Sequence, residues 1–263
     1  MWMTLVAAAL AAGAAVVAGL HWYGRRSACW GATGEEVAAR MSGDDWLAGD
    51  TSGPDRWPAR VRMTRAAWVD APPEDLWPWV AQMGRGAGWY SYDRIDNGGR
   101  PSARHIVSWI PQPRLGDACP IGYLRRLEPG RELVWWLPAV RFLGSEFRGV
   151  TLYRVSGAGG GSRLVVRIQA EAHGLLARPA CWLFRVVDGF MARRQLVGMV
   201  ERAERFGARR RDPDHPETGA RDQYQLYQAI YASGEEAGVP GKEGAAGSRR
   251  AAIADGVLEP PRA

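Results

Sequence analysis

The chain has 263 residues, of which 46% are hydrophobic and 24% are charged. This composition is typical of a folded globular protein and excludes a disordered, collagen-like or disulfide-rich chain. The formal net charge is +6, but the arginines that carry it are scattered among acidic residues and form no single basic face. We therefore expect no nucleic-acid partner.

Residues 1–24 are predicted to form a transmembrane anchor. The first 20 residues carry no charge, and about 20 apolar residues in a helix cross the hydrocarbon layer of a bilayer. Trp22 and Tyr23 suit the membrane interface, and Arg25 and Arg26 follow on the side that the positive-inside rule assigns to the cytoplasm. A cleaved signal peptide carries its positive charge before the apolar run. We expect a retained anchor in the cell membrane and a folded domain in the cytoplasm.

The rest of the chain divides into three predicted segments. Residues 25–56 mix Gly, Asp, Ser and Pro with isolated apolar residues, which indicates a linker with one short helix near residues 35–41. Residues 57–208 carry regular apolar patterns and form the predicted folded domain. Residues 209–263 end in Gly/Ala/Pro-rich sequence and are predicted to be a disordered tail, in which residues 224–231 could form a short helix.

The folded domain is expected to begin with a strand at residues 60–69, followed by a helix that starts at residues 71–75. Prolines are tolerated in a first helical turn, and acidic residues favour the positive end of the helix dipole. A buried stripe at helical spacing is predicted for Leu76, Trp79, Val80 and Met83. A short helical turn at residues 91–97 and a Gly/Pro-rich loop follow.

Four strands and a long helix complete the predicted domain. The strands are expected at residues 119–127, 131–137, 147–155 and 163–171, with a loop at residues 139–146. Residues 180–206 predict a long helix, because apolar residues recur near helical spacing with arginines between them: Leu183, Val186 or Val187, Phe190, Val197 and Val200. This order indicates an α+β fold in which a curved antiparallel sheet wraps around the long C-terminal helix.

The segment Ala71–Ala103 resembles the START-like, or SRPBCC, superfamily of polyketide cyclases and lipid carriers. The motifs that carry the resemblance are Trp77-Pro78-Trp79, Gln82-Met83-Gly84 and Gly88-Trp89-Tyr90-Ser91-Tyr92-Asp93, followed later by Leu115-Gly116-Asp117 and residues 162–167. The resemblance implies a helix-grip fold over residues 57–208 and a membrane-anchored bacterial subgroup. It supplies no catalytic set that carries over residue by residue.

The predicted binding site is an aromatic-lined cavity between the sheet and the long helix. Trp89, Tyr90 and Tyr92 lie in an irregular segment beside glycines, where ligand contacts are frequent. Pockets favour aromatic side chains with a few polar groups. The predicted ligand-binding residues are Trp79, Met83, Trp89, Tyr90, Tyr92, Asp93, Asn97, Arg104, Trp135 and Arg167.

Each of these residues also has a purely structural interpretation. Trp79 lies on a helical stripe and is suited to core packing. Asp93 and Asn97, one helical turn apart, are suited to capping and local hydrogen bonds. Strand arginines such as Arg148 and Arg167 could bind an anionic head group or pair with an acid on a solvated face.

The cysteines and histidines give little support to metal binding or catalysis. Cys29, Cys119 and Cys181 are widely spaced and show no Cys-x-x-Cys pair, so we expect reduced thiols, no metal and no cofactor. His105 could form a base–orienter pair with Asp93 only if the fold brings them together.

Three functions remain open from the sequence. The favoured one is a membrane-tethered domain that binds a hydrophobic small molecule, such as a lipid, isoprenoid or polyketide. A cyclase-, dehydratase- or hydrolase-type enzyme acting in the same cavity would show a buried titratable group with a shifted pKa. A protein-binding, chaperone-like module would show a filled cavity and an exposed apolar patch.

Overall fold

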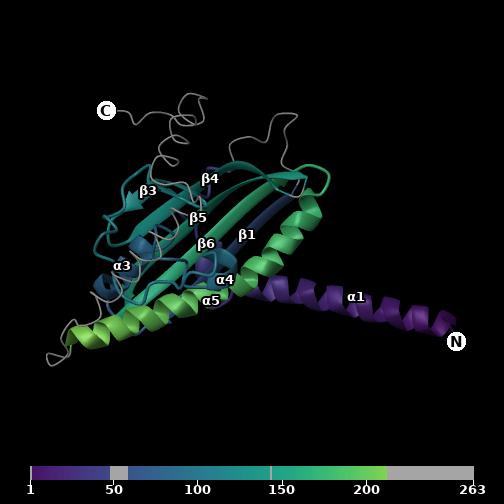
Figure 1. Ribbon diagram of the computed structural model, residues 1–263, viewed down its shortest axis with the longest axis horizontal. Helices are drawn as coiled ribbons and strands as arrows, with labels where there is room; N and C mark the ends of the chain where they lie inside the picture. The colour runs from purple at the N-terminus through teal and green to yellow at the C-terminus, as the bar shows by residue number, and fades with distance from the viewer. Residues whose placement is uncertain (1, 48–58, 143, 212–263) are drawn as a thin grey trace. The chain divides into compact units, whose positions relative to one another are not determined.

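The structure is a computed structural model that describes residues 2–47, 59–142 and 144–211 (Figure 1). Most of the predicted tail, including residues 224–231, and the end of the predicted linker lie outside the described residues. The elements in chain order are α1 (Trp2–Ser27), α2 (Gly34–Ala38), β1 (Ala59–Val69), α3 (Pro73–Gln82), α4 (Asp93–Asp96), β2 (Ala118–Cys119), β3 (Gly122–Glu128), β4 (Glu132–Phe142), β5 (Ser145–Ala158), β6 (Gly161–His173) and α5 (Ala177–Arg211).

The described strands form one six-stranded sheet in the order β1-β6-β5-β4-β3-β2, and every pair is antiparallel. Strands β2 to β5 each pair with the next strand along the chain, whereas β1 lies at the far edge beside β6. Register shifts interrupt the β3–β4 pair after Leu124 and the β4–β5 pair after Leu137, and such irregularities bend a sheet. The predicted α+β fold, a curved antiparallel sheet packed against a long C-terminal helix, is confirmed.

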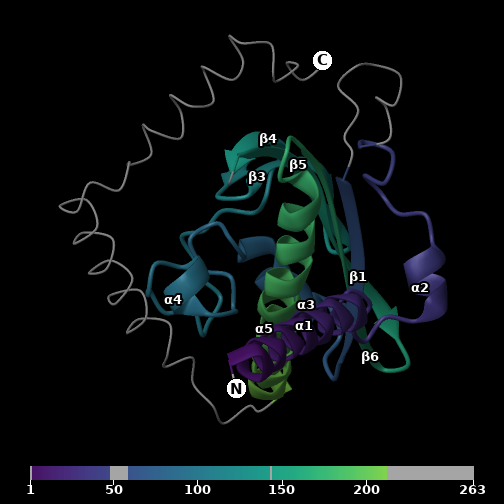
Figure 2. The ribbon, with the colours of Figure 1, turned by 90° about the vertical axis from the view of Figure 1, so that its right-hand side faces the viewer.

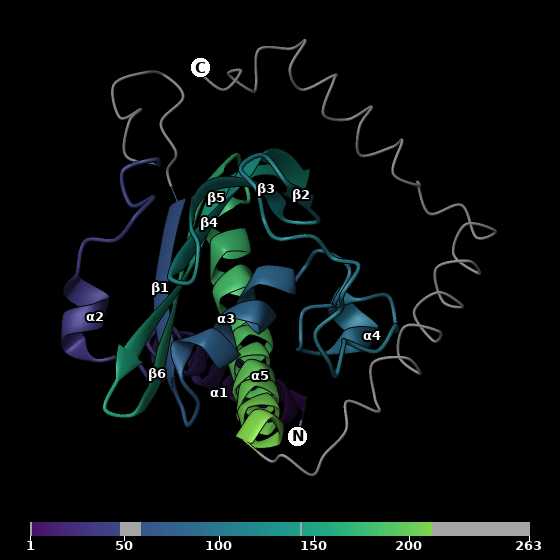
Figure 3. The same cartoon turned by 90° about the vertical axis from the view of Figure 1, so that its left-hand side faces the viewer.

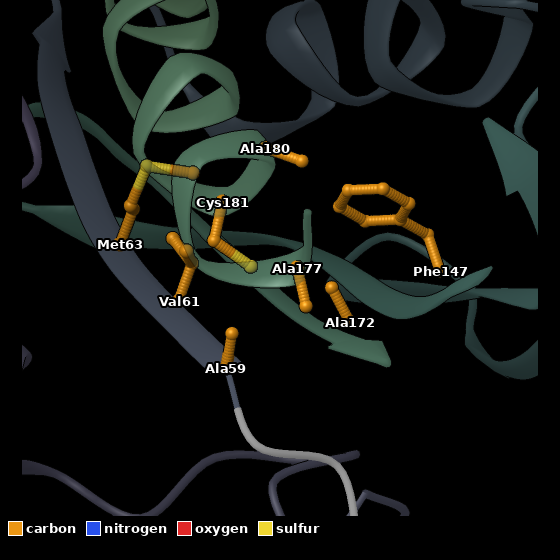
Figure 4. Close-up of a cluster of buried hydrophobic side chains, with 8 residues drawn as sticks. All are labelled: Ala59, Val61, Met63, Phe147, Ala172, Ala177, Ala180 and Cys181. Carbon is orange, nitrogen blue, oxygen red and sulfur yellow. The ribbon is translucent and has the colours of Figure 1, made fainter. Parts of the chain in front are cut away.

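The inner face of the sheet packs against α5. Because side chains alternate along a strand, Val61 and Met63 of β1 point the same way as Ala172 of β6, toward the start of α5. Figure 4 shows this cluster, whose buried members are Ala59, Val61, Met63, Phe147, Ala172, Ala177, Ala180 and Cys181. The helix α3 also packs against α5, on the same side of the sheet (Figure 3).

The outer face of the sheet is covered by residues 28–47, which we call the outer strap. It begins along the free edge of β1, where the amides of Thr64 and Ala66 donate to the carbonyls of Ala28 and Trp30 at 2.8 and 3.0 Å. Met41 and Leu47 are buried against the outer side chains of β1, β4, β5 and β6. Figures 2 and 3 show α2, which lies in the strap, and α5 on opposite sides of the sheet.

The helix α2 is defined by its N-terminal cap. The Thr33 side chain accepts from the Glu36 amide, and the Glu36 carboxylate accepts from the Thr33 amide, which forms a capping box. The sequence placed a short helix near residues 35–41, whereas α2 spans Gly34–Ala38. The segment predicted as a linker therefore contributes regular structure and covers the outer face of the sheet.

One sequence-based expectation is wrong. The loop expected at residues 139–146 is a short turn, because β4 extends to Phe142 and β5 begins at Ser145. The apolar residues whose spacing predicted α5 are only partly buried: Val186 is 5% exposed, whereas Leu183, Val187 and Phe190 are 43%, 48% and 48% exposed. The sheet packs against the opposite side of α5, whose buried residues are Cys181, Ala192, Leu196, Met199 and Ala203.

The helix α1 is long and apolar enough to span a membrane, with an 18-residue window of mean hydropathy 2.2 that the rest of the chain leaves unburied. Its C-terminal end packs against the middle of α5. The Tyr23 and Phe190 rings stack with centroids 4.2 Å apart. Gly24 lies against Val186, and the Ser27 side chain lies against Gly189. Small residues on both helices permit this close crossing.

Candidate ligand-binding site

The predicted aromatic residues of the first helical region are brought together around Tyr90. The Tyr90 hydroxyl accepts a hydrogen bond from Gln82 Nε2 at 2.9 Å. Trp79 meets Tyr90 edge-on at 6.0 Å and Phe206 of α5 edge-on at 6.2 Å. The Arg202 guanidinium lies 4.6 Å from the centroid of the Tyr90 ring. These contacts form a packed corner between α3 and α5.

Glycines just after α3 and in α5 allow the backbone around Tyr90 to pack closely. Tyr90 itself has a positive φ of 61°. Its carbonyl oxygen lies so near α5 that a Cβ placed on Gly198 would be 2.2 Å from it. Gly84 likewise lies against the Trp89 indole, which is 8% exposed. Met83, at the end of α3, is 1% exposed. The aromatic rings are therefore buried in close backbone-to-helix contacts.

The polar members of this region make local hydrogen bonds. Asp93 accepts from the Ser102 hydroxyl, whose oxygen in turn accepts from the Tyr90 amide. Asn97 Nδ2 donates to the Arg100 carbonyl at 2.7 Å. Tyr92 and Arg104, by contrast, are exposed. The structure thus gives Asp93 and Asn97 the local roles that turn residues usually have.

Arg167 lies on the outer face of the sheet, away from α5. Its guanidinium donates to Asp44 at 2.8 Å, to Thr64 at 2.9 Å and to backbone carbonyls of the outer strap. The side chain is 1% exposed. Arg167 therefore binds the strap to the sheet. Arg148 shows the pairing expected of strand arginines, with the Glu171 carboxylate 2.9 Å away.

Trp135 lies on the inner face and belongs to a group of polar residues that we call the inner polar cluster. Its members are Arg65, Cys119, Trp135, Tyr153, Asp188 and Gln195. Tyr153 Oη donates to Gln195 Oε1 of α5 at 3.0 Å. The indole N–H of Trp135 is buried and, among the described residues, has no hydrogen-bond acceptor. The cluster thus brings donors from the sheet, such as Arg65 and Tyr153, to acceptors on α5, Asp188 and Gln195.

Arg65 connects the inner polar cluster to the end of α1. Its Nη1 is 2.6 Å from Asp188 Oδ2 of α5, and its Nε donates to the Ser27 carbonyl at 2.6 Å. The Arg65 side chain is 1% exposed. A buried charge requires a partner of this kind, because an unpaired ion in the interior is costly.

Burial determines the protonation of the cluster. It raises the pKa of the Tyr153 phenol far above its ordinary value, and it raises the pKa of the Cys119 thiol to about 12. It also raises the pKa of Asp188, against the opposing charge of Arg65. The phenol and the thiol are therefore neutral at physiological pH, and the phenol donates its proton to Gln195.

A pocket of about 340 Å³ opens at the edge of the sheet, between β1 and α5. We call it the edge pocket. Its lining residues are Trp30, Gly31, Ala66, Ala67, Trp68, Arg163, Val197, Val200 and Glu201. None of the predicted ligand-binding residues belongs to this lining.

The charged groups of the edge pocket already have partners. Arg163 donates to the Glu36 carboxylate at 2.7 and 2.8 Å and to the Gly31 carbonyl at 2.7 Å. Glu201 lies 3.2 Å from the Arg205 guanidinium. The pocket therefore presents two indoles and aliphatic side chains, with its charges compensated at the rim.

His105 shows no catalytic pairing. Burial lowers the pKa of its imidazole, and the charges of Arg209 and Arg104 lower it further. The side chain of Asp93, the partner considered from the sequence, receives the Ser102 hydroxyl instead. Within the described ranges, no group of His, Cys, Asp and Glu is arranged to hold a metal ion.

Sequence reasoning missed most of the inner polar cluster and the edge pocket. Arg65 follows Val61 and Met63 at a period of two, so the alternation alone places a charge on an apolar face. Asp188 likewise interrupts the apolar part of α5. Both interruptions of an apolar face could have been used to predict a buried, paired charge at Arg65 and Asp188. Trp30 had no such signal, because it lies in a segment with no regular pattern.

No protein-family model matches the chain, and no curated protein matches it. Similar solved structures include protein MLL2253 from Mesorhizobium loti, which is 15% identical, with a TM-score of 0.34 over 58% of this chain and 99% of that chain. DynU16, from the dynemicin biosynthetic locus, is 17% identical, with a TM-score of 0.30 over 56% of this chain and 46% of that chain. The di-domain ARO/CYC BexL, from the BE-7585A biosynthetic pathway, is 15% identical, with a TM-score of 0.34 over 63% of this chain and 53% of that chain. Likenesses at this level carry no functional conclusion.

Proposed function

We propose that this chain is a membrane-tethered domain that binds a neutral hydrophobic small molecule in the edge pocket. The observation that carries the proposal is the pocket itself, which lies next to the point where α1 joins the domain. Trp30, in its wall, follows the last residue of α1, Ser27, by one short turn. A lipid, isoprenoid or polyketide would then reach the pocket from the bilayer, where such molecules are concentrated.

The lining supports an apolar and uncharged ligand. Trp30, Trp68, Val197 and Val200 supply apolar surface, and burial of apolar area contributes about 25 cal/mol per Å². A volume of about 340 Å³ lies in the range of small-molecule pockets. Because the charges at the rim are already paired, an ionic ligand would have to displace an existing partner.

The binding experiment uses the full chain in amphipol and the neutral fluorescent probe N-phenyl-1-naphthylamine. Val197→Trp places an indole in the pocket wall, at a half-buried position. The matched control is Ala208→Trp, an exposed position on the same helix outside the lining. We expect saturable binding to wild type and to the control, with the dissociation constant of Val197→Trp raised by about tenfold or more, equivalent to about 1.4 kcal/mol.

Two results would contradict the proposal. The first is the absence of a saturable fluorescence increase with wild type. The second is equal binding by Val197→Trp and Ala208→Trp, which would exclude the edge pocket. If Thr151→Trp, on the inner face beside Trp135, then weakened binding instead, the ligand would occupy the inner polar cluster.

A second candidate function, a cyclase-type enzyme, is favoured by the inner polar cluster. Tyr153 is a neutral, buried phenol that donates to Gln195 Oε1, and a substrate carbonyl that replaced this acceptor would receive a hydrogen bond able to stabilise the developing charge on its oxygen. The free indole N–H of Trp135 would add a further donor. Neither the neutral thiol nor the paired Asp188 is suited to act as a nucleophile.

This second candidate predicts faster enolisation of an apolar β-diketone. NMR measures the exchange of the α-protons of the β-diketone with D₂O. Wild type should accelerate this exchange, and Tyr153→Phe should accelerate it much less, because the variant loses the phenol donor. Both proteins should bind N-phenyl-1-naphthylamine equally. Equal exchange rates in the two proteins would exclude this role for Tyr153.

A further inference from the structure

The first half of α5 carries an apolar stripe that the described residues leave half exposed. Leu183, Val187 and Phe190 are 43%, 48% and 48% exposed, and Leu175 and Leu176 just before the helix are 95% and 47% exposed. Positions 176, 183, 187 and 190 fall on one face of a helix with 3.6 residues per turn. A contiguous apolar patch of this kind marks an interaction surface.

The stripe is continuous with the surface of α1. Phe190 stacks on Tyr23, and Val186 packs against Gly24. Trp22 of α1 is 67% exposed beside this crossing. Figure 2, which looks from the side on which α1 leaves the domain, shows the first half of α5 in plain view except where α1 crosses it. The membrane-spanning candidate and the apolar stripe therefore share one face.

The charges around the stripe have one sign. Between residues 174 and 200 the only acidic residue is Asp188, and its carboxylate is paired with Arg65 in the interior. Exposed arginines lie at both ends of the stripe and at the end of α1: Arg25, Arg26, Arg178, Arg193 and Arg194. Of these, Arg194 lies 3.7 Å from Glu201, just beyond the stripe. An apolar strip flanked by arginines is the pattern of a helix that lies in the interface of an anionic bilayer.

We propose that the first half of α5, with Leu175 and Leu176, lies in the interface of the same anionic bilayer that α1 spans. The inference rests on the membrane tether proposed above, and does not depend on the edge pocket. The domain would then be held against the membrane surface by the first half of α5 in addition to α1. This orientation explains why an apolar stripe of such regular spacing is not buried in the domain.

The test measures the surroundings of position 183 in the full chain. Leu183→Cys, in a Cys29→Ser background, is labelled with an NBD maleimide and reconstituted into vesicles of phosphatidylcholine and phosphatidylglycerol. Arg205→Cys is the matched control, because it lies on the same face of α5 beyond the stripe. The Cys29→Ser protein without a new cysteine measures labelling of the remaining thiols. Leu175→Cys, in the highly exposed turn before α5, provides a second labelling position that does not disturb packing.

We expect NBD at positions 183 and 175 to be several-fold brighter than at position 205 and to be quenched by doxyl-labelled lipid but not by iodide. Omitting phosphatidylglycerol should weaken this protection. If the chain floats with the vesicles but iodide quenches the label at position 183, α5 does not lie in the interface, and the tether through α1 stands. If the chain does not float, both the position of α5 in the interface and the tether through α1 are wrong. A label shielded from iodide yet insensitive to doxyl lipid would mean that a protein covers the stripe, which also overturns the proposal.

Discussion

Individual carboxylates on the outer face of the sheet are shared between two arginines. Glu132 lies 3.0 Å from Arg126 and 2.6 Å from Arg154. Glu171 lies 2.7 Å from Arg60 and 2.9 Å from Arg148. Both carboxylates are almost fully buried while their partners reach solvent, so each buried acid is compensated without burying the arginine charges completely.

Glu132→Gln tests this arrangement through its pH dependence. Burial favours the neutral acid, but hydrogen bonds from Ser42, Arg154 and Arg126 outweigh it and lower the pKa of Glu132. A lowered pKa in the folded state stabilises the protein above the unfolded pKa, and this contribution is lost as pH falls through the folded pKa. At pH 7 we expect the variant to lose about 1.5–3 kcal/mol.

The measurement is unfolding of the full chain in detergent, followed by near-ultraviolet circular dichroism. The gap between wild type and Glu132→Gln should close as the pH falls below about 4. Glu128→Gln is the control, because this carboxylate is 43% exposed beside Arg131, and should change stability by less than about 1 kcal/mol. A gap independent of pH would contradict the role assigned to Glu132.

At the scale of elements, the outer strap acts as an additional layer of the domain. Its backbone extends the sheet at β1, and its side chains bury Ala66, Val134, Val150 and Leu152 on the outer face. The polar connection is Arg167, whose guanidinium binds strap carbonyls and Asp44. Without the strap, the outer face would expose a broad apolar surface to water.

Arg167→Leu should detach the strap while leaving the inner face intact. The change removes the buried arginine partner of Asp44 and of the strap carbonyls and leaves Asp44 with the more exposed Arg62 and with Gln169. Breaking a buried ion pair costs about 3–5 kcal/mol. Hydrogen–deuterium exchange of the full chain should show much faster exchange over residues 33–47 than in wild type, with α5 little changed. Arg62→Ala, whose side chain is 46% exposed, is the control and should have a small effect. Uniform loss of protection across the chain would argue against a local role.

At the scale of the whole molecule, the helix α1 and the domain are held together by specific contacts. Arg65 bridges the last carbonyl of α1 and Asp188 of α5, and the rings of Tyr23 and Phe190 add a stacked contact. The end of α1 is therefore fixed to the domain, and in the membrane tether that we propose the orientation of α1 would determine which face of the domain meets the bilayer.

The proposed topology predicts where Cys29 is accessible. This thiol is exposed directly after α1, whereas Cys181 is buried. A membrane-impermeant maleimide should label Cys29 in inverted membrane vesicles and not in intact cells, because the arginines after α1 favour the cytoplasmic side. Cys29→Ser removes the signal and serves as the control. Labelling in intact cells would reverse the proposed orientation.

The sequence alone determined the fold class and nearly all of the helices and strands. Period-two alternation located the strands, and the proline and acid pattern before Leu76 located α3, because these signals depend on neighbouring residues only. The apolar run of α1 was visible for the same reason. The irregular segment beside glycines led us to predict a ligand cavity lined by Trp89, Tyr90 and Tyr92, whereas the structure packs Trp89 and Tyr90 into the domain and leaves Tyr92 exposed.

Only the tertiary structure decided which surfaces are covered and where a pocket remains. Arg167 meets Asp44, and Arg163 meets Glu36, across more than a hundred residues of chain, and no local pattern specifies such partners. The stripe of Leu183, Val187 and Phe190 has the spacing of a buried face, yet the sheet packs against the opposite side of α5, where Ala192 and Ala203 are buried. Periodicity shows that a helix face is apolar, but it does not specify what packs against that face.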